Sequence, residues 1–223
     1  DENELEIILE NIENVPYFII GAGSNLLIRD GGYKGIIVKL GKSFNNLSIR
    51  EDKIFAGASI LDTNIAKFAL LNSIKDLEFF SGIPGTIGGA IKMNAGCFGS
   101  ETKDVLKEFS IFKRNGERKT LTNKDIDFSY RNSNLSDNDI VTSVKLKAEI
   151  GEKNEIESKI KEIKLIRETS QPIKTKTGGS TFKNPKGRFA AKLIELADCK
   201  GLTFGDAAVS TKHSNFLVNL GKA

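Results

Sequence analysis

The sequence predicts an α+β protein with two domains, and three observations support this. Short apolar runs typical of strands are interspersed with four segments whose apolar residues recur at helical spacing. A glycine-rich stretch, Phe79–Glu101, separates the early strands from the later ones. A long charged helical pattern ends just before Pro172. We therefore place one domain at 1–150, a connecting helix at 151–171 and a smaller domain at 172–223.

The first domain is expected to contain two helices and several short strands. The predicted helices are Glu2–Glu13 and Ile60–Asn72, because their apolar residues are three or four positions apart. Asn115-Gly116 is a hairpin turn signal between later strands. The predicted strands are Tyr17–Ile20, Gly35–Leu40, Lys53–Gly57, Val105–Arg114 and Asp139–Glu149.

The remaining segments complete the prediction. Glu152–Thr169 is an amphipathic helix whose isoleucines are three or four apart, and its charged face is most simply a solvated face. Pro172–Lys176 is predicted as a linker, Gly187–Ala197 as a helix and Asn215–Asn219 as a strand.

Composition and charge exclude several classes of function. The 223 residues carry a net charge of +4 with both signs mixed along the chain, which disfavours a nucleic-acid partner and suits an anionic small molecule. Cys97 and Cys199 lie far apart and His213 is the only histidine, so no metal site is expected and the thiols should stay reduced. No apolar run is long enough to span a membrane, and we expect a cytoplasmic location.

The glycine-rich stretch Phe79–Glu101 is the most unusual part of the chain. It contains six glycines, and we expect neither helix nor strand there, because glycine costs backbone entropy and offers no side chain for packing. Such a backbone can turn sharply or touch a large ligand, and its N–H groups suit a phosphate or a flavin edge. A glycine-rich surface loop is the alternative.

Two nucleotide motifs were tested and rejected. The turn at 21–25 follows a strand, but the third glycine of a dinucleotide fingerprint would fall on Leu26. Gly41-Lys42-Ser43 is not a P-loop, because the leading glycine would fall on Ile36. Three small-residue turns remain, at 21–25, 57–59 and 82–89, and together they favour a long cofactor that carries a pyrophosphate.

Candidate catalytic residues follow the glycine-rich stretch. Arg131, beside Tyr130, could hold a carboxylate in two-pronged fashion, although a surface arginine is the simpler alternative. Ser180 follows two glycines, and Lys183 and Asn184 lie close behind it. No G-x-S-x-G elbow is present, so a proton-donor or hydrogen-bond role for the serine is favoured over a nucleophilic one. His213 is either a structural residue or a substrate contact.

Five segments together resemble one family. They are GAGSNLLIRD (21–30), SGIPGTIGGAIKMNAGCFG (81–99), SYRNS (129–133), TKTGGSTFKNP (175–185) and VSTKHSNFLVN (209–219). Their order and spacing are similar to those of the UDP-N-acetylenolpyruvoylglucosamine reductase (UDP-N-acetylmuramate dehydrogenase, MurB) family, in its shorter subtype. The resemblance implies an FAD-binding domain of the vanillyl-alcohol-oxidase (PCMH) type and a smaller α+β substrate-binding domain.

The resemblance also implies site residues. Those expected at FAD are Gly21, Ala22, Gly23, Ser24, Asn25, Leu26, Gly57, Ala58, Ser59, Gly82, Pro84, Gly85, Gly88, Gly89, Asn94, Ala95, Gly96 and Ile140. Those expected at the substrate are Tyr130, Lys183, Asn184 and His213, with Arg131 and Ser180 as catalytic residues and no metal.

The implied reaction belongs to peptidoglycan precursor synthesis and has two halves. NADPH reduces FAD, and hydride then passes from flavin N5 to the enolpyruvyl β-carbon of UDP-N-acetylglucosamine enolpyruvate. Arg131 would stabilise the negative charge that develops on the substrate carboxylate, and Ser180 would protonate the α-carbon. The expected state is a monomer or weak oligomer.

Some family features have no counterpart in this sequence. The chain ends at Ala223 without the family's C-terminal glutamate, and the usual N-terminal strand and glycine pair are missing, so a family member trimmed at both ends is expected. Three alternatives stay open at this point: an oxidase of small alcohols or sugars on the same fold, a non-catalytic nucleotide-sugar binding module, and a structural domain with glycine turns only.

Overall fold

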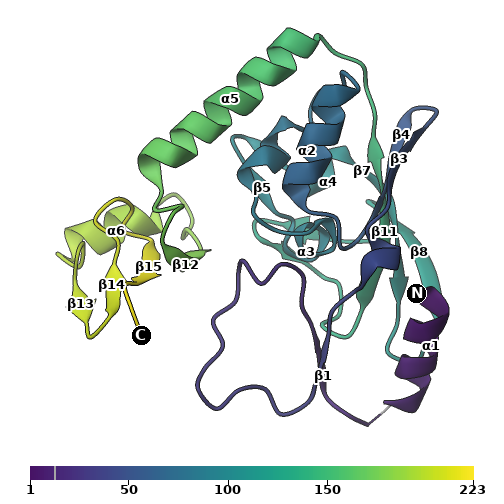
Figure 1. The fold of residues 1–223 in the computed structure, drawn as a ribbon, viewed down its shortest axis with the longest axis horizontal. Helices are drawn as coiled ribbons and strands as arrows, with labels where there is room; N and C mark the ends of the chain where they lie inside the picture. The colour runs from purple at the N-terminus through teal and green to yellow at the C-terminus, as the bar shows by residue number, and fades with distance from the viewer. Residues whose placement is uncertain (13) are drawn as a thin grey trace. The chain divides into compact units, whose positions relative to one another are not determined.

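The computed structural model describes residues 1–12 and 14–223, and the chain divides into two compact units (Figure 1). The first unit comprises Asp1–Ala22 and Ile28–Ile163, and the second comprises Gly23–Leu27 and Lys164–Ala223. Both units combine helices with strands, which confirms the predicted α+β class. The predicted end of the first helix at Glu13 lies outside the described residues.

A five-stranded antiparallel sheet forms the centre of the first unit, in the order β3-β4-β11-β7-β8. The bounds of its strands are β3 (Leu47–Arg50), β4 (Lys53–Gly57), β7 (Leu106–Phe112), β8 (Arg118–Thr122) and β11 (Ile140–Lys147). Three separate pairs of short strands accompany this sheet. They are β1 (Tyr17–Ile19) with β2 (Ile36–Val38), β5 (Gly96–Cys97) with β6 (Ser100–Glu101), and β9 (Phe128–Ser129) with β10 (Asn132–Ser133).

The helices of this unit are short apart from the last. They are α1 (Glu2–Asn11), α2 (Asp62–Leu71), α3 (Ile87–Met93), α4 (Thr102–Val105) and the 3-10 turns η1 (Lys42–Phe44) and η2 (Glu78–Gly82). α5 (Lys153–Ser170) continues from the first unit into the second, and the division falls between Ile163 and Lys164.

The main core lies between the sheet and the helices α2 and α3. Alternate residues of β11 such as Val144 and Leu146 point into it, because successive side chains of a strand face opposite sides. Ile65 of α2 and Ile91 of α3 are fully buried in the same cluster. Burial of this apolar surface is what holds the helices that carry the glycine-rich turns against the sheet.

A second, smaller core fixes α1 beside the end of the sheet. Leu5 and Leu9 of α1 are buried with Tyr17, Phe112 and Ile140. Asp1 and Glu4 form a capping box at the start of this helix.

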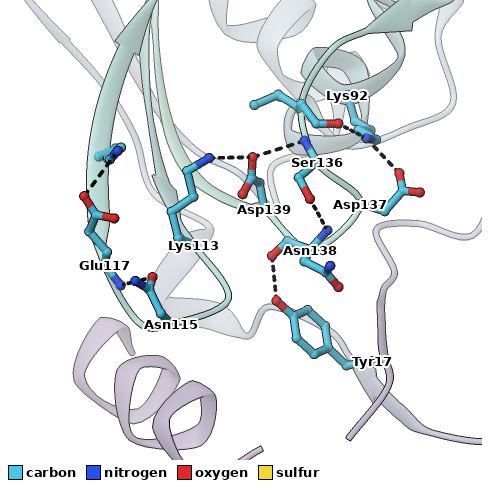
Figure 2. A network of polar contacts seen from close by, with 11 residues as sticks. Tyr17, Lys92, Lys113, Asn115, Glu117, Ser136, Asp137, Asn138 and Asp139 are labelled. Atoms are coloured by element: carbon cyan, nitrogen blue, oxygen red, sulfur yellow. Dashed lines mark hydrogen bonds and ion pairs between the residues drawn. The ribbon is translucent and has the colours of Figure 1, made fainter. Parts of the chain in front are cut away.

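A polar network fixes the segment that leads into β11 (Figure 2). The buried carboxylate of Asp139 pairs with Lys113 at 3.2 Å and accepts the Ser136 N–H at 3.1 Å. The ammonium of Lys92, on α3, pairs with Asp137 at 2.9 Å. These contacts tie the chain that follows β10 to both α3 and the sheet.

Two expectations for this unit were wrong. Asn115-Gly116 does form a turn, with Gly116 at φ +79, but it joins β7 to β8 rather than to the strand at 139–149, and β8 was not predicted. The glycine-rich stretch also contains a helix, because Gly88 and Gly89 lie inside α3. Packing of Ile87 and Ile91 in the core outweighs the poor helix propensity of the two glycines.

The second unit contains a four-stranded antiparallel sheet in the order β12-β15-β14-β13. Its elements are β12 (Lys176–Ser180), α6 (Ala190–Leu196), β13 (Thr203–Phe204), β14 (Ala207–Val209) and β15 (Phe216–Asn219). Val218 and Ala208 are opposite one another and buried, whereas Leu217 points to the other face and is exposed. β12 was not predicted as a strand, because its two glycines disguise it.

Candidate functional site

Parts of the three glycine turns that were predicted to bind a cofactor pack against one another within the first unit. A Cβ atom on Gly21 would lie 2.4 Å from the Thr86 hydroxyl, and one on Gly88 would lie 3.0 Å from the Ala58 Cβ. A Cβ on Gly57 would lie 2.1 Å from the Phe44 carbonyl oxygen. At these three positions the missing side chain therefore allows one segment of the chain to pack closely on another.

Several N–H groups of these turns are already hydrogen-bonded within the protein. Gly57 donates to Asn46, Ala58 to Thr142 and Ser59 to Phe44, at 2.9, 2.9 and 3.1 Å. The central sheet and its loops therefore use these three N–H groups. Gly57 and Ala58 are also buried, and their carbonyl groups accept the N–H groups of Ile60 and Gly88, whereas Ser59 is partly exposed and keeps surface for a ligand contact.

The start of α3 offers a different surface. Gly89 is exposed, and a Cβ there would have only the Thr86 hydroxyl within 4 Å, at 3.7 Å. Among the described residues, the Gly89 N–H has no hydrogen-bond partner, whereas the N–H groups of Ile87, Gly88 and Ala90 all have one. A bare backbone donor at a helix N-terminus is suited to an anionic group. Pro84 is exposed and Gly85 partly so on the approach to this point.

Arg131 lies at the tip of a two-residue hairpin between β9 and β10, next to Tyr130. Its φ of +52 is left-handed, which costs a residue with a side chain about 1–2 kcal/mol. The guanidinium lies over the Tyr130 ring, 4.9 Å from the ring centroid. It also donates to the Gly96 carbonyl and pairs with Glu101 at 3.8 Å.

Asn94 holds this hairpin in place by side-chain hydrogen bonds. It ends α3 in a left-handed conformation and is completely buried. Its amide donates to the Ser129 carbonyl and to Glu101, both at 3.0 Å, and its oxygen accepts the Lys103 N–H at 3.1 Å. Because the residue is completely buried and its amide is used by these contacts, Asn94 supports the hairpin and has no exposed surface of its own.

Ile140 is similarly placed in the interior. It is completely buried in the smaller core with Phe112 and Tyr17. Like Asn94, this residue has no exposed surface of its own. Gly82, Ala95 and Gly96, by contrast, are partly exposed.

Ser180 ends β12 in the second unit, where the strand has an irregular register. The pairing with β15 shifts between Thr177 and Ser180, and Gly179, at φ +86, lies in the irregularity. A left-handed glycine in such a bulge re-aims the following side chain. Ser180 is exposed, as is Lys183.

Asn215 holds the segment that follows Ser180. Its side-chain amide donates to the Phe182 carbonyl at 2.8 Å and accepts the Phe182 N–H at 2.9 Å. Its carbonyl accepts the Thr181 N–H at 2.8 Å. Asn184 has a related role, because its side-chain oxygen accepts the N–H of Ala190 at the start of α6. Sequence reasoning did not select Asn215, although its strand-like neighbours and its place in a motif were available signals.

His213 is held by its surroundings as a neutral ring. Its Nδ1 accepts the Asn215 N–H at 3.3 Å. Its ring packs edge-on against the Phe216 ring, with 4.7 Å between the two ring centroids. Burial lowers the pKa of His213, and the opposing effect of Glu195 is smaller. His213 therefore has a structural role, because it accepts a backbone hydrogen bond and packs against Phe216. Its Nε2 atom remains for a ligand contact.

The first glycine turn is divided between the units. Gly21 and Ala22 group with the first unit, whereas Gly23–Leu27 groups with the second. There, a Cβ on Gly179 would lie 3.9 Å from the Ser24 carbonyl oxygen, and one on Gly178 would lie 3.5 Å from that of Leu26. The turn therefore packs beside the strand that carries Ser180.

Within residues 1–12 and 14–223, no group of three His, Cys, Asp or Glu side chains is arranged to hold a metal ion. In the same part of the chain, no helix has the length and apolar character needed to cross a membrane.

Comparison with known protein families identifies two matching regions. Residues 1–122 match a family described as "FAD binding domain". Residues 171–223 match one described as "UDP-N-acetylenolpyruvoylglucosamine reductase, C-terminal domain".

Individual relatives cover the whole chain. The UDP-N-acetylenolpyruvoylglucosamine reductase of Nitrobacter winogradskyi is 46% identical over 225 residues, which cover 100% of this chain and 74% of that protein. That of Rickettsia conorii is 42% identical and is covered to 76%.

Solved structures agree. The UDP-N-acetylenolpyruvylglucosamine reductase from Thermus caldophilus has a TM-score of 0.88 and 35% identity, covering 100% of this chain and 80% of that one. A carbon monoxide dehydrogenase from Hydrogenophaga pseudoflava, at TM-score 0.52 and 14% identity over 66% of this chain and 56% of that one, shares the fold alone.

Proposed function

The chain belongs to the UDP-N-acetylenolpyruvoylglucosamine reductase family, and from this premise we propose that it reduces UDP-N-acetylglucosamine enolpyruvate to UDP-N-acetylmuramate. It is an oxidoreductase with an FAD-binding domain. We propose NADPH as the reductant and a cytoplasmic role in peptidoglycan precursor synthesis.

One observation carries this proposal beyond family membership. Within the second unit, the predicted cofactor turn packs on β12 beside the predicted proton donor, with Ser24 against Gly179 and Ser180 next in the chain. A cofactor turn and an acid must be close neighbours if a hydride and a proton are to reach adjacent carbons of one substrate. This juxtaposition supports Ser180 as the donor.

The residues present fit FAD. The unpartnered N–H of Gly89 and the exposed backbone of the turn before it are suited to an anionic pyrophosphate or to the edge of a flat ring. Ala22 and Pro84 add exposed surface that lacks long side chains. When bound, FAD supplies hydride-transfer chemistry.

The protein's own residues supply charge stabilisation and a proton. Arg131 binds the substrate carboxylate, where negative charge develops as the enol ether is reduced, and a well-placed donor of this kind contributes about 3 kcal/mol. Ser180 donates its hydroxyl proton to the α-carbon. Serine is a weak acid, so this step requires a strongly basic carbon held at close range. Tyr130, Lys183, Asn184 and His213 are proposed to bind the rest of the substrate.

The test separates the two halves of the reaction in a Ser180→Ala variant. Flavin absorbance is followed anaerobically, first on mixing with NADPH and then on mixing the reduced protein with UDP-N-acetylglucosamine enolpyruvate. The variant should be reduced by NADPH at the parent rate, and product formation should fall at least about 100-fold, the usual contribution of general acid catalysis.

Ser170→Ala is the matched control, because Ser170 is a partly exposed serine at the end of α5 whose hydroxyl, among the described residues, bonds only to the Ile166 carbonyl. It should leave both halves unchanged. Unaltered product formation in Ser180→Ala would show that Ser180 is not the donor. A parent protein that binds no FAD would contradict the proposed function as a whole.

A further inference from the structure

We propose that Glu101 is a positioning residue for Arg131, which it holds on one side so that the remaining guanidinium donors are available to a carboxylate ligand. The inference rests on the proposed function, because it takes Arg131 as the group that binds the substrate carboxylate. It concerns only residues of the first unit.

Arg131 is restrained by the protein at several points. Its Nη1 lies 3.8 Å from the Glu101 Oε1, its Nη2 donates to the Gly96 carbonyl, and its guanidinium stacks on Tyr130. Among the described residues, its Nε has no hydrogen-bond partner. About a third of the side chain, 31%, is exposed, so a ligand can reach the unused donors. This is the arrangement of a cation that is held on one side and open on another.

Glu101 is itself anchored more firmly than a surface carboxylate. Its Oε2 accepts from the buried Asn94 amide and from the Lys103 ammonium, both at 3.0 Å. Its backbone N–H donates to Asp104 at 2.8 Å. Only 24% of the Glu101 side chain is exposed. A carboxylate that is held by a fully buried neighbour keeps its own position. It can therefore fix the position of a guanidinium that pairs with it.

The charges of this cluster balance before any ligand binds. Glu101 and the neighbouring Asp104 together offset the two positive charges of Lys103 and Arg131. Removal of the glutamate charge would strengthen the general attraction for an anion but release the guanidinium from its orientation. A positioning role therefore predicts a lower rate without weaker binding, whereas a general packing role predicts loss of both.

The experiment compares Glu101→Gln with Glu108→Gln in the FAD-bound protein. Glu108 is a matched control, because it is a carboxylate of the same unit that pairs with Lys145 and is 32% exposed. In Glu101→Gln we expect reduction by NADPH at the parent rate and a roughly tenfold slower reaction with the substrate. Glu108→Gln should leave both rates unchanged.

Calorimetry provides a readout other than activity. The dissociation constants of UDP-N-acetylglucosamine, which lacks the carboxylate, and of its enolpyruvyl ether are measured on the oxidised protein. The dissociation constant of UDP-N-acetylglucosamine divided by that of the enolpyruvyl ether reports the binding of the carboxylate. This ratio should be at least as large in Glu101→Gln as in the parent. A ratio that falls in proportion to the rate of the substrate reaction would overturn the proposal.

A double variant decides whether the glutamate acts through the arginine. If it does, Glu101→Gln should add no further loss in an Arg131→Ala background, because nothing remains to be positioned. Additive losses, an unchanged substrate reaction in Glu101→Gln, or equal slowing of both half-reactions would each overturn the inference. A parent protein that does not react with the substrate would instead contradict the proposed function, so the two failures are distinguishable.

Discussion

The backbone N–H of Gly88 donates a hydrogen bond to the carbonyl oxygen of Ala58 at 3.0 Å. This bond joins the first turn of α3 to the turn after β4, two segments that the sequence predicted as separate cofactor contacts. Ala58 is itself fixed, because it is buried and its own N–H donates to Thr142 of β11. The glycine surface is therefore part of a rigid framework built on the central sheet.

Gly88→Ala should destabilise the protein, whereas Gly89→Ala should not. The new methyl group at 88 would lie 3.0 Å from the Ala58 Cβ and 3.1 Å from its oxygen, and such overpacking costs about 1–3 kcal/mol. At 89 the nearest atom is 3.7 Å away, and the higher helix propensity of alanine should contribute up to about 1 kcal/mol. Urea unfolding of both variants provides the measurement. Equal effects at the two positions would contradict the packing seen around Gly88.

Asn215→Ala should loosen the segment that follows Ser180. The substitution removes both side-chain hydrogen bonds to Phe182, and leaving these backbone groups unpaired should cost about 1–3 kcal/mol. Hydrogen exchange should accelerate at Thr181 and Phe182. Asn219→Ala is the control, because the Asn219 side chain bonds, within the described part of the chain, only to the exposed residues Gly221 and Ala223. If protection at Phe182 were the same in both variants, the proposed clamp would be wrong.

Asp62 should make the protein less stable as the pH rises above the acidic range. Its carboxyl group is completely buried and, within the described residues, neither oxygen has a hydrogen-bond partner. Burial raises the pKa of Asp62 well above its ordinary value of 3.8. The folded state thus retains a proton that the unfolded state loses from about pH 4 upward, so this stabilising difference is present at low pH and is lost as the pH rises through the folded-state pKa.

An Asp62→Asn variant lacks this titration. Its advantage in unfolding free energy over the parent should grow as the pH increases from 4 toward neutrality, as measured by urea unfolding at several pH values. An advantage that stays constant over this range would show that the Asp62 carboxyl titrates normally in the folded protein.

Lys159→Met should destabilise more than Lys161→Met. Lys159 lies 3.6 Å from the buried carboxylate of Glu78, and its removal would leave that charge without its counter-ion. We expect a loss of about 1–3 kcal/mol, below the value for a fully buried pair because Lys159 is half exposed. Lys161 pairs with Glu157 on the surface of the same helix, and its loss should cost under about 0.5 kcal/mol. Similar values in thermal and urea unfolding would refute the assigned difference.

The sequence was most informative where the signal is local. Helical spacing predicted α1, α2 and α5 to within a few residues. The resemblance to the reductase family is confirmed by relatives that cover the whole chain. Such features depend on residues close together in the sequence, where periodicity and turn chemistry act directly.

Expectations that required knowledge of distant neighbours were less successful. The glycines of 88–89 suggested a loop, but core packing of the flanking isoleucines makes a helix there. The N–H groups of 57–59 bond to Asn46, to Thr142 of β11 and to Phe44 of η1. The anchoring of Glu101 by the buried Asn94 had no local signature.

Residue type and spacing were sufficient to determine the α+β class and the candidate chemical groups, and the resemblance of five segments indicated the family. Only the folded chain decided which glycines contact protein and which stay open, and that Gly23–Leu27 packs beside the strand of Ser180. The physical reason is that a glycine has no side chain that could select a particular neighbour. What a bare backbone touches depends on which sheet and helix burial brings against it, and those partners are more than 60 residues away in the sequence for Gly21 and Thr86.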